Sequence, residues 1–281
     1  MADLIKGENY SEVWLNAMEL MAAGDGKGVN LAVAFPANSA GNLDLEAELE
    51  AFLAEKDVKH GIETVANTIF PAALYHPHLG EEAAARLYEN FEMSMRIHTR
   101  TGGEKETYFN RLVAYPVADG TAGDLDKRLR EDGTFNQLQF FVERLAKQAK
   151  QGHSSSSYEL GVSHPTDGEL RVQAPFTDKS MWSFPCLSHI SLTLADGAVH
   201  MCATYRNQTF ITRAYGNYVG LAKLLRFIAN ESGVEAGEVM VTASHADAEF
   251  VTLGKTAVKS LIERCSEIIG PDITEEVVLG G

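Results

Sequence analysis

Cysteine is the residue type in this chain that most directly raises the question of catalysis. The sequence has three, Cys186, Cys202 and Cys265, and their spacing fits neither a zinc site nor a disulfide framework. Each is therefore either a small buried apolar side chain or, once ionised, a nucleophile. The run His76-Pro77-His78 could suggest a metal site, but no acidic or cysteine partner stands at ligand spacing. The sequence therefore predicts no bound metal.

The elements that would position these residues change from helices to strands along the chain. Helical spacing of apolar residues predicts helices over 11–23, 45–56, 60–74, 81–99, 135–150, 217–230 and 256–269, the third interrupted at Pro71. Ser11 and Asn217 are residue types that cap helices. Alternation of apolar and polar residues predicts strands over 170–175, 186–194, 199–206 and 238–243, and Asp196-Gly197 is a hairpin signal. Helices followed by antiparallel strands with one crossing helix predict an α+β fold.

Composition limits the classes of protein that this chain can belong to. Its 281 residues, 45% of them hydrophobic, suffice for one large core, and no linker is evident, so we expect one domain over residues 1–281. The net charge of −15 disfavours nucleic acid and anionic membrane as partners. No stretch is apolar enough to span a membrane, and the N-terminus lacks a signal-peptide pattern. We therefore expect a cytoplasmic protein whose substrate, if a nucleotide, is a free one.

Residues 185–243 carry an ordered set of short motifs. Along the chain these are Pro185-Cys186, Asp196-Gly197, Tyr205-Arg206, Asn217 and the turn at 234–238. In their order and ungapped spacing they resemble the core of thymidylate synthase and the related pyrimidine nucleotide hydroxymethylases. Segments 108–112 and 136–139 are similar to two further motifs of that family. The resemblance implies a divergent member with a thymidylate synthase-like fold, in which helices flank a mostly antiparallel or mixed sheet.

The resemblance also implies a homodimer in which two sheets pack face to face. The strand predicted over 186–194 would present His189, Ser191 and Thr193 on one of its faces. If that strand is central in the sheet, something must cover this face, and a second copy of the chain would do so.

The chemistry implied by the resemblance starts from Cys186. In that family the cysteine thiolate adds to C6 of a pyrimidine, which makes C5 carbanion-like and able to attack 5,10-methylenetetrahydrofolate. Arg206 stands where the family has a guanidinium that lowers the thiol pKa and binds phosphate. Asn217 stands where the family reads the base. A neutral amide offers one donor and one acceptor, matching O4 and N3–H of uracil, but the same residue could be a helix N-cap.

Several positions depart from the family pattern. Asp247 and Glu249 replace a His-x-Tyr pair that holds the sugar 3′-hydroxyl, and Asn207 replaces a serine. Gly168-Glu169 aligns with two consecutive phosphate-binding arginines. Carboxylates are poor neighbours for a phosphate dianion and good acceptors for hydroxyls or ring amines. The candidate substrate-binding residues, for a ligand other than ordinary deoxyuridine monophosphate, are Arg206, Asn207, Asn217, Asp247 and Glu249.

Two more departures leave three functional hypotheses open. The family's proton-transferring glutamate aligns with Asn67, and its folate-contacting aspartate aligns with Thr209. The first hypothesis is a one-carbon transferase that methylates or hydroxymethylates C5 of a pyrimidine nucleotide or nucleoside. The second is a homologue that binds a ligand without catalysis. The third is a cysteine enzyme that performs C5 chemistry on a pyrimidine-like ring without folate.

Overall fold

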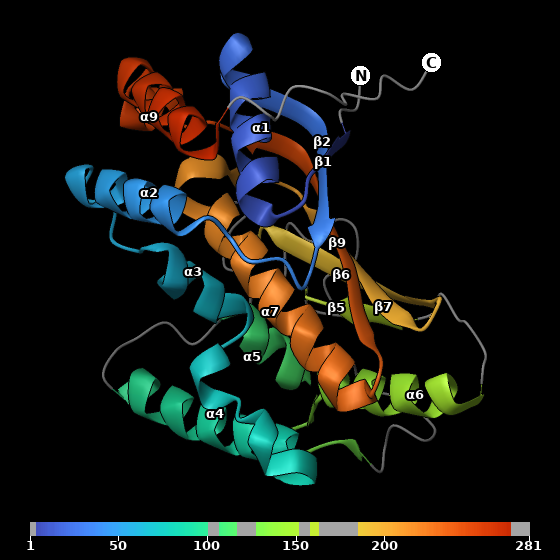
Figure 1. The fold of residues 1–281 in the computed structure, drawn as a ribbon. Coiled ribbons are helices and arrows are strands. Elements are labelled where there is room, and N and C mark those ends of the chain that lie inside the picture. The colour runs from blue at the N-terminus through green and yellow to red at the C-terminus, as the bar shows by residue number, and fades with distance from the viewer. Residues whose placement is uncertain (1–3, 101–106, 117–127, 152–157, 163–184, 271–281) are drawn as a thin grey trace.

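A mixed β-sheet forms the centre of the molecule (Figure 1). The computed structural model describes residues 4–100, 107–116, 128–151, 158–162 and 185–270. The strand order is β1-β2-β9-β7-β6-β5, and the short β8 pairs with β9. The strands span Leu4–Lys6 (β1), Lys27–Pro36 (β2), Tyr158–Gly161 (β5), Leu187–Ala195 (β6), Ala198–Tyr205 (β7), Gln208–Thr209 (β8) and Glu235–Asp247 (β9). A separate pair joins β3 (Tyr115–Pro116) to β4 (Thr134–Phe135).

Both strand directions occur in the sheet. The pairs β1-β2, β7-β9 and β8-β9 are parallel, whereas β2-β9, β5-β6 and β6-β7 are antiparallel. The predicted hairpin is confirmed between β6 and β7, where Asp196 and Gly197 have φ values of 51° and 81°. Two successive residues with positive φ are typical of the tightest hairpin turns. The strand predicted over 170–175 lies outside the described residues.

Helices flank this sheet. They are α1 (Tyr10–Ala23), α2 (Leu43–Glu55), α3 (Ile62–Ile69), α4 (Ala83–Arg100), α5 (Tyr108–Val113), α6 (Gln137–Gln151), α7 (Tyr215–Ser232), α8 (Phe250–Leu253) and α9 (Lys255–Ile269). Shorter turns are η1 (Ala72–Leu74), η2 (Pro77–Glu82) and a π-helical segment, η4 (Phe210–Ala214), that leads directly into α7. Helices α1 and α7 lie against the same face of the sheet (Figure 1). The predicted α+β class, with a mixed sheet flanked by helices, is confirmed.

The predicted cap at Ser11 is wrong, and so is the alternative interpretation of Asn217 as a helix cap. Asn9, and not Ser11, caps α1, because the Asn9 side chain accepts hydrogen bonds from the amides of Ser11 and Glu12. The Ser11 hydroxyl instead lies 2.6 Å from the Tyr215 hydroxyl. Asn217 lies inside the first turn of α7, since the π-helical segment η4 adds helical residues ahead of it. A cap signal is local, so it could not show that helical residues begin earlier, in η4.

Two glycines let α3 approach the N-terminal half of α7. A Cβ atom at Gly216 would lie 2.6 Å from Val65 Cβ, and one at Gly220 would lie 2.8 Å from the Ala66 carbonyl oxygen. Real Cβ atoms do not come so close to their neighbours, so the packing of these helices depends on both glycines. This contact fixes the part of α7 that carries Asn217.

The helices that the structure describes include none with the combined length and apolarity that a membrane crossing requires. The prediction of a single domain over residues 1–281 stays a prediction.

Candidate active site

The predicted catalytic residue lies at one end of the sheet. Cys186 directly precedes β6, and Arg206 directly follows β7, whose last residue is paired with Leu187. The Arg206 amide donates to the Cys186 carbonyl oxygen at 3.0 Å, and its Nε donates to the Pro185 carbonyl oxygen at 3.1 Å. The hairpin therefore brings Arg206 beside the Pro185-Cys186 pair. Cys186 itself is half-buried.

Tyr108, which was not among the predicted site residues, contacts the backbone next to Cys186. The Tyr108 hydroxyl, on α5, accepts a hydrogen bond from the Leu187 amide at 3.4 Å. Burial raises the pKa of Tyr108, and the neighbouring Cys186 raises it further, against the opposing effect of backbone hydrogen bonds and Arg213. The phenol thus keeps its proton at neutral pH and remains a hydrogen-bond donor. The similarity of segment 108–112 to the family was the signal that could have identified it.

Two further tyrosines, one of them near Cys186, have buried hydroxyls. Tyr205 and Tyr218 are both fully buried, and neither hydroxyl has a hydrogen-bond partner in the described part of the chain. Burial raises the pKa of Tyr205, and the nearby Tyr108, Tyr218 and Cys186 raise it further. Buried polar groups without partners are rare in folded proteins, so these two hydroxyls require a specific explanation.

Asn217 is a buried polar residue at the start of α7. It lies in the first turn of α7 and is only 4% exposed. Burial of a polar amide is unfavourable unless the amide is hydrogen-bonded. Its reading of a pyrimidine edge stays a prediction.

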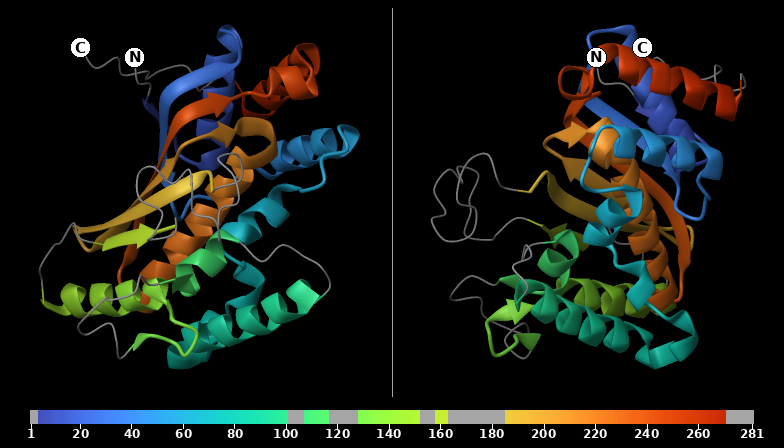
Figure 2. Two further views of the ribbon diagram at one scale, coloured as in Figure 1. Left: turned by 180° about the vertical axis from the view of Figure 1, so that it is seen from behind. Right: turned by 90° about the vertical axis from the view of Figure 1, so that its left-hand side faces the viewer.

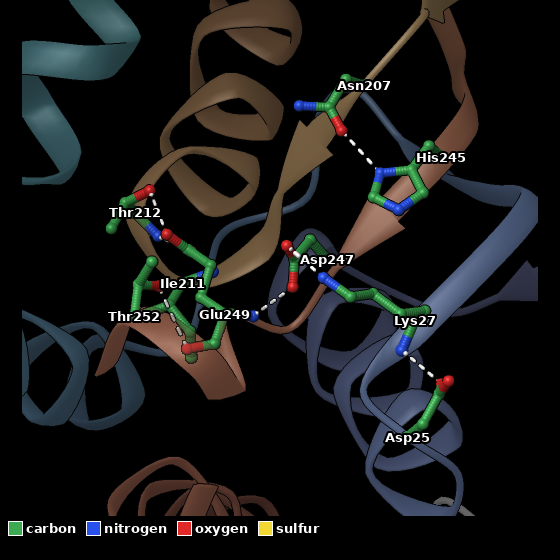
Figure 3. A network of polar contacts seen from close by, with 9 residues as sticks. All are labelled: Asp25, Lys27, Asn207, Ile211, Thr212, His245, Asp247, Glu249 and Thr252. Carbon is green, nitrogen blue, oxygen red and sulfur yellow. Dashed lines mark hydrogen bonds and ion pairs between the residues drawn. The ribbon is translucent and has the colours of Figure 1, made fainter. Parts of the chain in front are cut away.

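Three of the predicted substrate-binding residues belong to a polar network at the end of β9, drawn in Figure 3. The Asn207 side-chain oxygen lies 2.7 Å from His245 Nδ1. Asp247 lies opposite Lys27 in the β2-β9 register, and their side chains form an ion pair at 2.5 Å. Lys27, which sequence reasoning missed, therefore neutralises a carboxylate that was predicted to face the ligand. The Asp247 side chain is 25% exposed, so it remains at the edge of the network.

Glu249 is the most enclosed member of this network. It is 7% exposed, and its carboxylate accepts hydrogen bonds from the amides of Ile211 and Thr212 at 2.9 and 2.8 Å. The Thr212 hydroxyl donates to its other oxygen at 2.9 Å. Burial raises the pKa of Glu249, the hydrogen bonds from Thr212 and Ile211 oppose that change, and Asp247 adds to it. Both carboxylate oxygens therefore bind the protein itself, whereas contact with a ligand stays a prediction.

The remaining cysteines lie elsewhere. Cys202 is on β7, opposite Ser191 of β6, and burial followed by the charge of Glu159 raises its pKa. Cys265 is fully buried in α9, and burial raises its pKa to about 12. Among the described residues, no three His, Cys, Asp or Glu side chains lie together as a metal site would require. His76 and His78 lie beside each other, with ring centroids 5.7 Å apart, in and next to η2.

Comparison with known proteins finds a distant and partial similarity. A protein described as "Putative thymidylate synthase" from Methanococcoides burtonii is 22% identical to this chain over 135 residues. The match covers 48% of this chain, and the chain spans 56% of the relative's length. No family model matches. The similarity therefore points to a thymidylate synthase-like relationship and leaves the substrate and the reaction open.

Proposed function

We propose that this chain is a thymidylate synthase-like enzyme that uses the Cys186 thiolate to activate a pyrimidine ring for one-carbon transfer to C5. The observation that carries the proposal is that Arg206 and Tyr108, from separate elements, both contact the backbone of residues 185–187. A cysteine nucleophile needs a cationic or hydrogen-bond-donating environment to form and hold a thiolate. The distant relative adds independent support for the family.

The proposed step at Cys186 begins with formation of a bond between its sulfur and C6 of the ring. Electrons of the C5–C6 double bond move toward O4, so that the ring becomes an enolate and C5 becomes nucleophilic. After the new group is attached, a base removes the C5 proton and the sulfur–C6 bond breaks, which regenerates the thiolate. The protonated Tyr108 phenol can donate a hydrogen bond to the sulfur or to the ring during these steps.

The one-carbon unit would come from 5,10-methylenetetrahydrofolate if the chain uses that cofactor. The residues present do not match the family's folate contact, because Thr209 replaces its aspartate and the Thr209 hydroxyl lies 3.0 Å from the Thr212 hydroxyl. We therefore derive no step through folate. The buried Asn67 side-chain oxygen, at the position of the family's glutamate, has no hydrogen-bond partner in the described residues. This keeps folate-independent C5 chemistry, or ligand binding without catalysis, as the second candidate.

The proposed substrate is a pyrimidine nucleoside or nucleotide other than deoxyuridine monophosphate. A phosphate dianion is bound best by guanidinium or ammonium groups with donors to spare. Here Lys27 is paired with Asp247, and Glu249 occupies the amides at the start of η4. Arg206 gives its Nε donor to the Pro185 carbonyl. The local charges therefore favour hydroxyls or amines over phosphate.

A homodimer is part of the same proposal. Alternate residues of β6 and β7 are fully buried under the helices, and the residues between them are partly exposed on the other face of the sheet. In the left panel of Figure 2, no described helix lies in front of these two strands. That face carries a polar cluster in which Glu159 accepts a hydrogen bond from Ser191 at 2.6 Å and contacts His189. A second copy, packed by its own sheet, would cover this face. Light scattering at micromolar concentration tests the assembly.

The direct test of catalysis is release of tritium from C5 of labelled uracil and cytosine nucleosides and nucleotides. We expect release by the wild-type chain and by Cys202→Ala, and none by Cys186→Ala. Release that requires 5,10-methylenetetrahydrofolate supports one-carbon transfer, and release without it supports folate-independent chemistry. Absence of release across the panel, with binding retained, would show a ligand-binding homologue instead.

A further inference from the structure

The carboxylate of Glu249 meets the start of a helix from outside that helix. Glu249 lies in the turn between β9 and α8. Its carboxylate accepts hydrogen bonds from the amides of Ile211 and Thr212, which are 38 and 37 positions earlier in the chain. These two amides are in the first turn of η4, where helical amides lack partners within the helix. No side chain from the residue that precedes η4 caps it. Glu249 therefore supplies the hydrogen-bond acceptors that η4 lacks. Because η4 leads directly into α7, we call residues 210–214 the entrance of α7.

The backbone around Glu249 is itself tightly held, as Figure 3 shows. Its amide donates to Asp247 Oδ1 at 2.7 Å, and the other oxygen of that carboxylate pairs with Lys27. Its carbonyl oxygen accepts from the Leu253 amide at 2.9 Å. Glu249 also adopts a left-handed conformation, with φ 60° and ψ 31°. That conformation is unfavourable for a residue with a side chain, and the contacts of the Glu249 backbone and carboxylate hold it.

The segment that Glu249 holds leads directly to the residues of the proposed site. The π-helix η4 contains Arg213 and continues into α7, whose first turn contains Asn217. The other side of this entrance is held by the Trp14 indole, which donates to the Phe210 carbonyl at 2.8 Å. Loss of the Glu249 contacts would free one side of the entrance and leave the other in place. The consequence would be a change in the direction of Asn217 and not a loss of the fold.

We propose that Glu249 is a positioning residue, which holds the entrance of α7 so that Asn217 is directed at the ligand, and that it does not itself bind the ligand. The inference rests on the proposed function, from which it takes the ligand: a pyrimidine whose edge binds the Asn217 amide. It reassigns Glu249 from the substrate-binding role that its sequence position suggested.

The test compares Glu249→Ala and Glu249→Gln with a matched control, Glu50→Gln. The Glu50 carboxylate accepts a hydrogen bond from the Ile62 amide at 2.7 Å, so it also binds an amide in the first turn of a helix, α3. Glutamine at 249 retains a carbonyl oxygen that can accept from the two amides, whereas alanine retains no acceptor. If Glu249→Ala does not fold, Glu249→Asp takes its place in both readouts, because its shorter side chain keeps the carboxylate without the reach to the two amides.

The first readout is amide hydrogen exchange in peptides covering residues 209–219. Loss of charge-assisted hydrogen bonds predicts exchange at least about tenfold faster in Glu249→Ala, largely restored in Glu249→Gln and unchanged in Glu50→Gln. Unchanged exchange in Glu249→Ala would overturn the proposed hold on this entrance. This measurement needs no ligand, so it is independent of the proposed function.

The second readout is the ratio of uridine to cytidine affinity, measured by calorimetry. A misdirected Asn217 predicts a ratio that falls about tenfold in Glu249→Ala and returns toward wild type in Glu249→Gln. An unchanged ratio despite faster exchange would overturn the positioning of Asn217. If wild type binds neither nucleoside, the proposed function fails, and hydrogen exchange decides the structural role of Glu249 by itself.

Discussion

The buried hydroxyl of Tyr205 allows a sharp test of the geometry around Cys186. Tyr205 is fully buried, and its hydroxyl has no hydrogen-bond partner in the described residues. An unsatisfied buried polar group costs about 1–3 kcal/mol, most of which the change Tyr205→Phe would recover, since phenylalanine has the same ring without the hydroxyl. For a chain of this size, about 1 kcal/mol corresponds to roughly 2–4 °C in the melting temperature. We therefore expect Tyr205→Phe to melt a few degrees above wild type.

The matched control is Tyr215→Phe. Tyr215 is equally buried, but its hydroxyl lies 2.6 Å from Ser11 Oγ and donates to Glu46 Oε1 at 3.1 Å. Removal of this hydroxyl takes one hydrogen bond each from Ser11 and Glu46 and should lower stability by about 1–3 kcal/mol. The opposite signs of the two changes, followed by differential scanning fluorimetry and urea denaturation, form the test. A melting temperature that falls in Tyr205→Phe would show that its hydroxyl is hydrogen-bonded in solution and would refute the reasoning.

The other predictions concern reactivity, charge and pH. In native protein at pH 7.5, iodoacetamide should modify the half-buried Cys186 and spare Cys265, whose pKa is raised by burial to about 12. Mass spectrometry of peptides measures the labelling, and early labelling of Cys265 would contradict its buried placement. The change Asp247→Asn leaves Lys27 without its ion-pair partner and should strengthen deoxyuridine monophosphate binding relative to uridine by about tenfold, as measured by calorimetry. An equal effect on both ligands would show that the Asp247 charge does not disfavour phosphate. Because the folded-state pKa of Glu249 is raised, the folded state holds its proton more tightly than the unfolded state, so its contribution to stability declines as pH rises above the ordinary glutamate value of 4.5. Urea denaturation across this range should therefore show wild type losing stability relative to Glu249→Gln as pH rises, and a difference that does not vary with pH would refute it.

Local signals in the sequence determined the elements and the link between Cys186 and Arg206. Apolar periodicity predicted most of the helices, and the Asp196-Gly197 turn predicted the hairpin that joins β6 to β7. Because a two-residue turn fixes the register of the strands that it connects, the spacing placed Cys186 and Arg206 at the same end of the hairpin. A register shift between Leu187 and His189 then changes the pairing by one residue, which the spacing did not predict. The class of fold followed from the same order of helices and strands.

The tertiary structure alone decided which distant residues complete the site. Tyr108 and Leu187 are 79 positions apart, and Glu249 reaches amides 37 and 38 positions earlier. The ion pair of Lys27 with Asp247 depends on β2 lying beside β9, which no periodicity in either strand specifies. Sequence patterns report the face on which a residue lies, but strand order and register decide what that face meets. For this reason two carboxylates that sequence position assigned to a ligand are bound by the protein itself. Asp247 pairs with Lys27, and Glu249 accepts hydrogen bonds from the first amides of η4.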